Sequence, residues 1–201
     1  MRFPSFLRGT ASRGFSLAEL LVVVAIMGLL ATISTPGLVR SYRASTLTAS
    51  GNRAVDLAMQ ARQNALSRNA MTALVLAING ASPNQAMTVI ELQADQTWKQ
   101  ISSWAFLSPN AKAYPNGGAS TTLPGTAPTL VLNGKSLGAG GYACYVFNPD
   151  GTTYNSAAVL PQLYVQYASD TAPSGGGGNT GLPNYYDLVF SDAGGIHIVR
   201  P

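Results

Sequence analysis

A single acid interrupts the apolar N-terminal part of this chain of 201 residues. Glu19 is the only charged side chain among the nineteen residues from Phe15 to Ile33, a stretch about long enough to cross a bilayer as a helix. A carboxylate at the centre of such a span costs about 2.5–3.5 kcal/mol, so Glu19 needs a partner even near the end of the segment. Cleavage after Gly14 would supply one, because the new amino group of Phe15 would lie four positions away along a helix. If the chain is cut there, this amine and the Glu19 carboxylate of the same or a neighbouring subunit would neutralise each other.

The residues before this cut form a short basic leader. Met1 to Arg13 contains three arginines and no acid. Behind this leader, the run Gly14-Phe15-Ser16-Leu17-Ala18-Glu19 resembles the processing site of type IV prepilins and type II secretion pseudopilins. The resemblance implies that a prepilin peptidase cleaves after Gly14 and N-methylates Phe15. It also implies that the apolar helix first anchors the subunit in the inner membrane and later packs with other subunits in a filament core.

Two other interpretations of the N-terminus remain open. One is an ordinary secretory signal, since a basic segment precedes an apolar one. Glu19 at the start of the apolar stretch and the lack of a clear Ala-x-Ala cleavage site argue against it. The other is a plain signal anchor on an unrelated periplasmic domain. The localisation that we expect is a single pass through the inner membrane, with the globular domain periplasmic or extracytoplasmic, and a place in a filament after assembly.

We expect four segments along the chain. They are a leader over residues 1–14, a membrane and filament-core helix over 15–38, an amphipathic continuation over 39–69 and a globular β domain over 70–201. About 160 residues remain after the leader and the span, which is enough for one domain with a core. Pro36 predicts a kink in the helix. Small apolar residues recur at helical spacing and predict a buried stripe, namely Leu47, Gly51, Ala54, Ala58, Ala61 and Ala65.

Two-residue periodicity predicts an antiparallel sheet beyond Asn69. We expect a long surface loop with one short strand over 108–140, and a flexible glycine-rich excursion over 171–183. Pro161 should restrict its strand to an edge or a bulge. The sequence Asn148-Pro149-Asp150-Gly151 predicts a tight turn. The strands are predicted at 71–78, 87–92, 97–107, 141–148, 159–167, 185–190 and 195–200.

The predicted fold class is α+β, with a long N-terminal membrane-spanning helix packed on an antiparallel β-sheet domain. The order of a long helix, a meander, the corner at 147–151 and a terminal strand at 195–200 resembles the GspH/FimT group of minor pilins and pseudopilins. Only one cysteine, Cys144, is present, so no internal disulfide can form. It lies in a strand-like run and is predicted to be a core residue.

The sequence shows no motif for catalysis, so we do not expect an enzyme, a cofactor or a metal site. Asn133-Gly134-Lys135-Ser136 lacks the first glycine of a phosphate-binding loop. His197 alternates with two isoleucines in the last strand and is predicted to lie on the surface. Asp150 and Asp192 could each bind Ca²⁺, but neither lies in a dense acidic loop, so we interpret them as turn residues.

The distribution of charge argues against nucleic acid as a partner. Residues 34–69 carry five arginines and one acid, whereas residues 70–201 carry four basic and six acidic side chains. DNA affinity grows with the number of phosphate contacts, and basic side chains are too few beyond Asn69. Weak anion contacts are conceivable only at four arginines, which are Arg53, Arg62, Arg68 and Arg200.

The function predicted from these patterns is that of a minor pilin or pseudopilin, processed after Gly14. It would be incorporated in a type IV pilus or a type II secretion pseudopilus and help to initiate assembly. The alternative is a pilus-associated module that binds DNA for uptake or an exported substrate. Pili and type II secretion systems share these signals, so the choice between them stays open.

Overall fold

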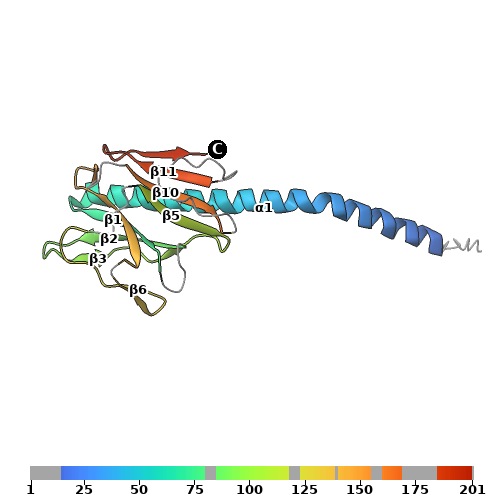
Figure 1. Cartoon of the computed structure of the whole chain (residues 1–201), viewed down its shortest axis with the longest axis horizontal. Coiled ribbons are helices and arrows are strands. Elements are labelled where there is room, and N and C mark those ends of the chain that lie inside the picture. The colour runs from blue at the N-terminus through green and yellow to red at the C-terminus, as the bar shows by residue number, and fades with distance from the viewer. Residues whose placement is uncertain are drawn as a thin grey trace, which may run out of the picture. The chain divides into compact units, whose positions relative to one another are not determined.

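The computed structural model describes residues 15–79, 85–117, 123–138, 140–154, 160–168 and 185–200. For residues 33–36 and 117 it describes the backbone only. The chain divides into two compact units, Met1–Ser41 and Tyr42–Pro201. One helix, α1 (Leu17–Arg68), runs through 52 residues and contributes to both units (Figure 1). This confirms the predicted helix, which continues through Pro36; the kink there stays a prediction.

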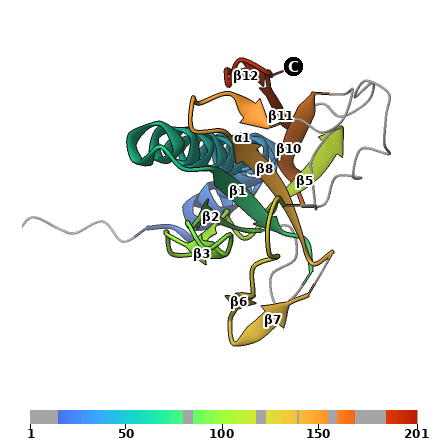
Figure 2. The same cartoon turned by 90° about the vertical axis from the view of Figure 1, so that its left-hand side faces the viewer.

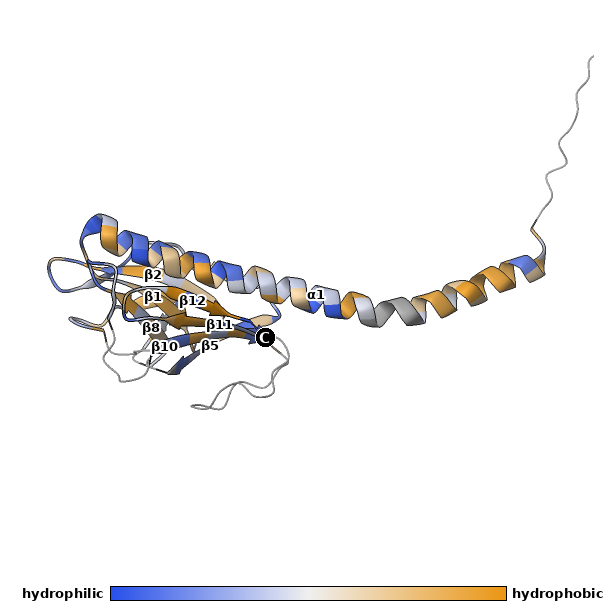
Figure 3. Ribbon diagram, turned by 90° about the horizontal axis from the view of Figure 1, so that it is seen from above, coloured by the Kyte–Doolittle hydropathy of each residue, from blue (hydrophilic) through white to orange (hydrophobic). Residues whose placement is uncertain are grey.

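The N-terminal part of α1 is apolar on every side. Its large side chains are exposed from Leu17 to Leu30, and Figure 3 shows most of the ribbon here as hydrophobic, apart from a hydrophilic first turn. An 18-residue window of α1 reaches a mean hydropathy of 2.4 with none of it buried. By length and composition, this is the one helix among the described residues that could cross a membrane. Because no other described residue covers these side chains, they need lipid or other chains around them.

The second unit contains a first antiparallel sheet in the order β3-β2-β1-β8-β9. A short strand, β4 (Ala105–Phe106), also pairs with β2. Strand β1 lies at the centre and pairs with β8 over its whole length and with β2 from Thr72 to Leu76. The strands on the path are β1 (Thr72–Ala77), β2 (Ala86–Leu92), β3 (Trp98–Gln100), β8 (Tyr142–Phe147) and β9 (Thr153–Tyr154).

A second antiparallel sheet of four strands has the order β12-β11-β10-β5. It pairs β5 (Ala111–Gly117) with β10 (Pro161–Tyr167), β10 with β11 (Tyr185–Phe190) and β11 with β12 (Ile196–Val199). A separate hairpin joins β6 (Leu130–Leu132) to β7 (Lys135–Leu137). Its turn is Asn133-Gly134, and both residues have positive φ, as a tight hairpin turn requires.

The main core lies between α1 and one face of each sheet. The predicted stripe packs here: Leu47 is nearly fully buried and Ala54, Ala58, Ala61 and Ala65 are fully buried. Figure 2 shows α1 beside strands of both sheets. The small side chains on this stripe let the strands approach the helix closely. Strand side chains complete the cluster, including Leu74, Leu76, Tyr145, Phe147, Leu163, Leu188 and Phe190.

A second core lies on the other face of the first sheet. Alternate residues of β1 and β8, such as Val75 and Cys144, point into it. The β6–β7 hairpin covers this face, on the side away from α1 (Figure 2). Two tryptophan side chains hold the covering segment, because Trp98 Nε1 donates to Pro124 O at 2.7 Å and Trp104 Nε1 donates to Val131 O at 2.8 Å. All six residues of β1 are therefore buried.

Two expectations about the β domain were wrong. The region 108–140 is not a surface loop with one short strand, since it forms β5, β6 and β7. Leu123, Leu132 and Leu137 from this region are buried in the second core. Its Pro and Gly residues shape turns between short strands. Its composition is therefore typical of a loop, although the segment is packed. Pro161 does not lie on an edge strand, because β10 is central; proline is tolerated there as the first residue of the strand.

Most other expectations for the β domain are confirmed. The predicted strands occur, except that the strand at 97–107 is split into β3 and β4. The turn at Asn148-Gly151 closes with a bond from Gly151 N to Asn148 O of 2.8 Å. Cys144 is buried and His197 is exposed. The excursion at 171–183 lies outside the described residues.

Candidate processing and assembly site

The first turn of α1 is closed by reciprocal hydrogen bonds. Ser16 N donates to Glu19 Oε2 at 3.1 Å, and Glu19 N donates to Ser16 Oγ at 3.2 Å. This arrangement is a capping box, which satisfies two backbone N–H groups that a helix otherwise leaves unpaired. Ser16 is therefore the N-cap residue of α1. Sequence reasoning missed this role, although the spacing Ser-x-x-Glu is its usual signal.

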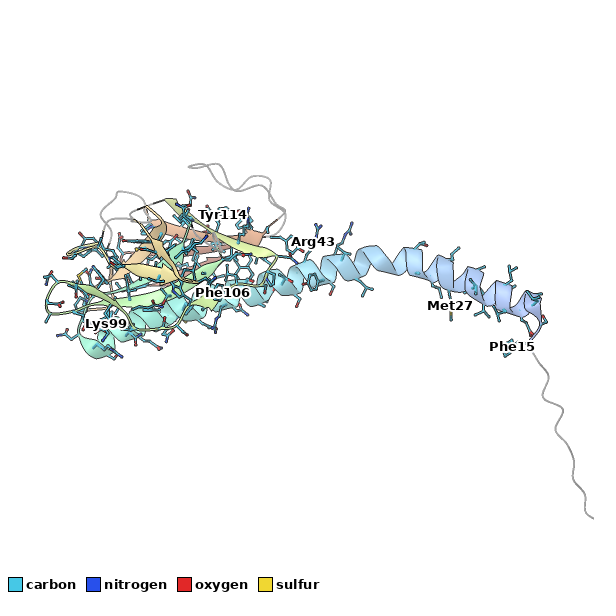
Figure 4. All side chains as sticks on the ribbon, turned by 90° about the horizontal axis from the view of Figure 1, so that it is seen from below. Phe15, Met27, Arg43, Lys99, Phe106 and Tyr114 are labelled. Carbon is cyan, nitrogen blue, oxygen red and sulfur yellow. The ribbon has the colours of Figure 1, made fainter. Side chains whose placement is uncertain are left out.

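The capping box holds the Glu19 carboxylate at the N-terminal end of the helix. Negative charge is favourable there, because the helix dipole and the free N–H groups are positive. Phe15 directly precedes Ser16, and its side chain is 81% exposed. Figure 4 shows Phe15 at the start of the helix and Met27 standing out from it three turns later. Gly14, the predicted cleavage position, lies outside the described residues. Cleavage after Gly14 would create an amino group on Phe15. This amino group would lie one residue before Ser16 N, which already donates a hydrogen bond to Glu19.

The four arginines considered as anion contacts do not form one patch. Arg53 and Arg62 lie nine positions apart on the helix, which places them on opposite sides at about 100° per residue. Arg62 is tied to the β domain, because its Nε donates to Gly151 O at 3.0 Å. Arg68 bridges to Glu91 at 3.0 Å. A flat basic surface therefore does not form from these side chains.

Arg200 and Arg53 also lie next to other side chains. Arg200 contacts an aromatic ring and an amide, and Arg53 has a carboxylate nearby. The Arg200 guanidinium lies 3.9 Å from the centre of the Tyr186 ring, and its Nη2 is 3.5 Å from Asn52 Oδ1. Arg53 lines a cavity of about 440 Å³ between α1 and the segment that links β3 to β4. The same cavity carries an acid, Asp56, so the local charge is balanced.

The two turns that carry the C-terminal motifs meet against α1. Thr153 N donates to Asp192 O at 3.1 Å, which joins the start of β9, directly after the turn that follows β8, to the turn before β12. Gly194 has φ of 77° and packs so closely on Gly151 O that any Cβ at this position would collide with it. Leu66 of the helix packs against Gly151. The corner at 147–151 and the last strand therefore act as one structural unit with the helix.

Titratable groups in the β domain are shifted mainly by burial. Burial raises the pKa of Asp187 on β11 to about 6, and its Oδ1 has no hydrogen-bond partner in the described structure. Burial also raises the pKa of the Cys144 thiol, which makes it an unreactive core residue. Asp150 accepts bonds from Thr152, which lower its pKa, as expected of a turn residue. Among the described residues, no group of three or more His, Cys, Asp or Glu side chains could hold a metal ion.

Comparisons with known proteins agree with this picture. Residues 10–35 match the family described as "Prokaryotic N-terminal methylation motif". A structure of the minor pseudopilin EpsH from the type II secretion system of Vibrio cholerae superposes with a TM-score of 0.50 at 8% identity, covering 79% of this chain and 96% of that one. None of the curated proteins matches the sequence significantly.

Two further solved structures are similar at lower scores. A second EpsH structure has a TM-score of 0.47 at 9% identity, covering 77% of this chain and 97% of that one. The type IV minor pilin FimU of Pseudomonas aeruginosa has a TM-score of 0.46 at 12% identity, covering 77% of this chain and 92% of that one. The chain thus combines a match to the prokaryotic N-terminal methylation motif over residues 10–35 with a fold similar to that of the minor pseudopilin EpsH.

Proposed function

We propose that this chain is a minor pilin or pseudopilin that a prepilin peptidase cleaves after Gly14 and methylates on Phe15. Before assembly, the segment 15–38 anchors it in the inner membrane with the β domain on the far side from the cytoplasm. It then enters a type IV pilus or a type II secretion pseudopilus beside other pilin subunits. There it helps to initiate the filament.

The observation that carries this proposal is the pairing of an exposed apolar helix with a methylation motif at its start. The match over residues 10–35 includes Gly14, Phe15 and Glu19. The apolar segment belongs to the same helix, α1, whose later residues from Leu47 to Ala65 pack on the sheets. An apolar helical segment of this kind can move from lipid into a filament core, since both surroundings bury apolar side chains.

The arginines give DNA uptake no comparable support. Three of the four have internal contacts, to Gly151, Glu91 and Asn52, and the fourth shares its cavity with Asp56. Non-specific DNA binding needs several cations that reach phosphates together. The structural role is therefore the better supported of the two candidate functions.

Proteomics of filaments sheared from producing cells tests the proposal. The chain should be recovered there, and its intact mass should correspond to a start at Phe15 with one added methyl group. A deletion of the prepilin peptidase gene should leave the full-length chain in the membrane fraction. A product that still begins at Met1 in wild-type cells, or one cut near Ala31, would contradict the proposal.

A further inference from the structure

Strand β12 runs along the side of α1 in the opposite direction. At one end, Arg200 contacts Asn52. At the other end, Gly194 and Ile196 border a cavity that helix residues from Met59 to Leu66 also line. Ten helical residues span about 15 Å, and a four-residue strand spans about 14 Å. The two contacts therefore place β12 and α1 side by side over the whole length of the strand.

An apolar groove lies between these two elements. Its deepest part is a cavity of about 160 Å³ lined by Met59, Arg62, Gln63, Leu66, Gly194 and Ile196. This volume suits one large apolar side chain. Met59 and Leu66 are 46% and 48% exposed, and Ile198 on the strand is 44% exposed. Alternate residues of a strand share a face, so Ile196 and Ile198 extend the apolar surface along the groove.

Strand β12 is also a weakly protected edge among the described strands. It pairs with β11 only, and its four residues include no Lys, Pro or acid. The opposite edge of the same sheet, β5, carries Lys112 and Pro115, which discourage further pairing. In the first sheet, the outer strands β3, β4 and β9 have only two or three residues. Natural proteins protect an edge of this kind unless something pairs with it.

The charges on the groove indicate what kind of segment fits. Arg62 is the only charged side chain that lines the cavity, and its described contact uses Nε, which leaves the terminal N–H donors of the guanidinium for another acceptor. Arg200 lies at the far end. The groove thus carries one basic side chain at the cavity and another at its far end.

We propose that the groove between α1 and β12 binds an extended segment of a neighbouring filament subunit. This segment pairs with the edge of β12 that no described strand occupies, places one large apolar side chain in the cavity and directs an acidic side chain to Arg62. The inference rests on the proposed function, because it assumes that other pilin subunits are neighbours. The inference goes beyond that function because it names the surface of this chain that a neighbouring subunit contacts.

Photo-crosslinking in the full-length chain tests this surface. A photoreactive benzoylphenylalanine replaces Leu66 in one variant and Val131 in the control, since both side chains are 48% exposed. Crosslinks are read in total membranes and in sheared filaments of producing cells. We expect the Leu66 variant to crosslink at least fivefold more to a different pilin subunit, through a segment that contains an acidic residue. Equal crosslinking at the two positions, a product with a second copy of this chain, or none at Leu66 would overturn the proposal.

A pair of substitutions separates docking from folding. Leu66→Glu places an acid beside the groove, whereas Val131→Glu places one on the β6–β7 hairpin. We expect the Leu66→Glu chain to be at least fivefold depleted from filaments at unchanged resistance to protease, and the control to be incorporated normally. Incorporation of both variants at the wild-type level would refute the docking site alone. Absence of the wild-type chain from filaments, with the Leu66 crosslink retained in membranes, would refute the proposed function alone.

Discussion

Ser16 and Glu19 exchange hydrogen bonds across the first turn of α1, at 3.1 and 3.2 Å. The sequence predicts that the Glu19 carboxylate pairs with the amine of Phe15. The structure gives this carboxylate a second partner in the same chain, Ser16. This partner exists without cleavage and without a neighbour, so it reduces the cost of the acid while the helix is still in lipid. Cleavage after Gly14 would add a cation next to a carboxylate that is already in place.

Ser16 should determine how firmly the first turn is held. Ser16→Ala removes the hydroxyl acceptor and should weaken the cap by about 1 kcal/mol. Amide hydrogen exchange of Glu19 in detergent micelles should then be about fivefold faster. Ser16→Thr keeps the hydroxyl and serves as the control. Unchanged exchange in the alanine variant would show that the capping box does not form in a membrane-like environment.

Glu19 combines two roles that one substitution can separate. Glu19→Gln keeps a side chain that can complete the capping box but cannot neutralise the Phe15 amine. Membrane insertion should be preserved or improved in this variant and in Glu19→Ala, because a costly acid is removed. Both variants should fail to enter filaments, measured as copies per filament in sheared fractions. Normal incorporation of Glu19→Gln would show that the cap, and not the charge, is what assembly requires.

DNA binding by the β domain should be negligible at physiological salt. Every residue of both core clusters lies within Tyr42–Pro201, so a fragment of residues 40–201 keeps its own core and can be tested alone. A gel-shift titration against random duplex should show no complex at low-micromolar protein. Residual binding, if present, should be lost in Arg53→Ala, the least constrained of the four arginines. Low-micromolar affinity that disappears in Arg200→Ala would instead support a DNA-binding function.

Gly51 should be intolerant of any side chain. A Cβ at this position would enter the Tyr186 ring, which packs directly on the helix backbone there. Gly51→Ala should lower the free energy of unfolding of the 40–201 fragment by about 1–3 kcal/mol, as overpacking of a filled core does. Gly138→Ala is the matched control, since no atom lies within 4 Å of its added Cβ. Urea denaturation of the two variants gives the comparison.

Asp187 should make the β domain less stable as the pH rises. Its pKa is about 6 in the folded chain against an ordinary value of 3.8, so the folded state holds its proton more tightly than the unfolded state. Stability should fall between about pH 4 and pH 6 and then level off. Asp187→Asn should remove this slope and stabilise the fragment at pH 7.5. Urea denaturation at pH 4.5 and 7.5 checks the sign, and an unchanged slope in the variant would assign it to other groups.

Local patterns in the sequence were enough to predict the helix, its buried stripe and most strands. The stripe from Leu47 to Ala65 follows from helical spacing, and β11 occupies the predicted range. The Ser16 cap could also have been predicted, since Ser-x-x-Glu lies directly before the apolar run. These features depend on residues close together in the chain, where backbone geometry alone sets which side chains share a face.

Tertiary structure decided what the chain brings together over longer distances. The composition of residues 108–140 predicted a surface loop. Leu132 and Leu137 are nevertheless buried, because the hairpin lies against a sheet whose other face is covered by α1. Pro161 lies in a central strand because it is the first residue of β10, a position at which the missing backbone N–H of proline is tolerated. The contacts of Arg62 and Arg200 likewise depend on which turns and aromatic rings lie against the helix. Such contacts join residues about 90 and 150 positions apart, so no local pattern could specify them.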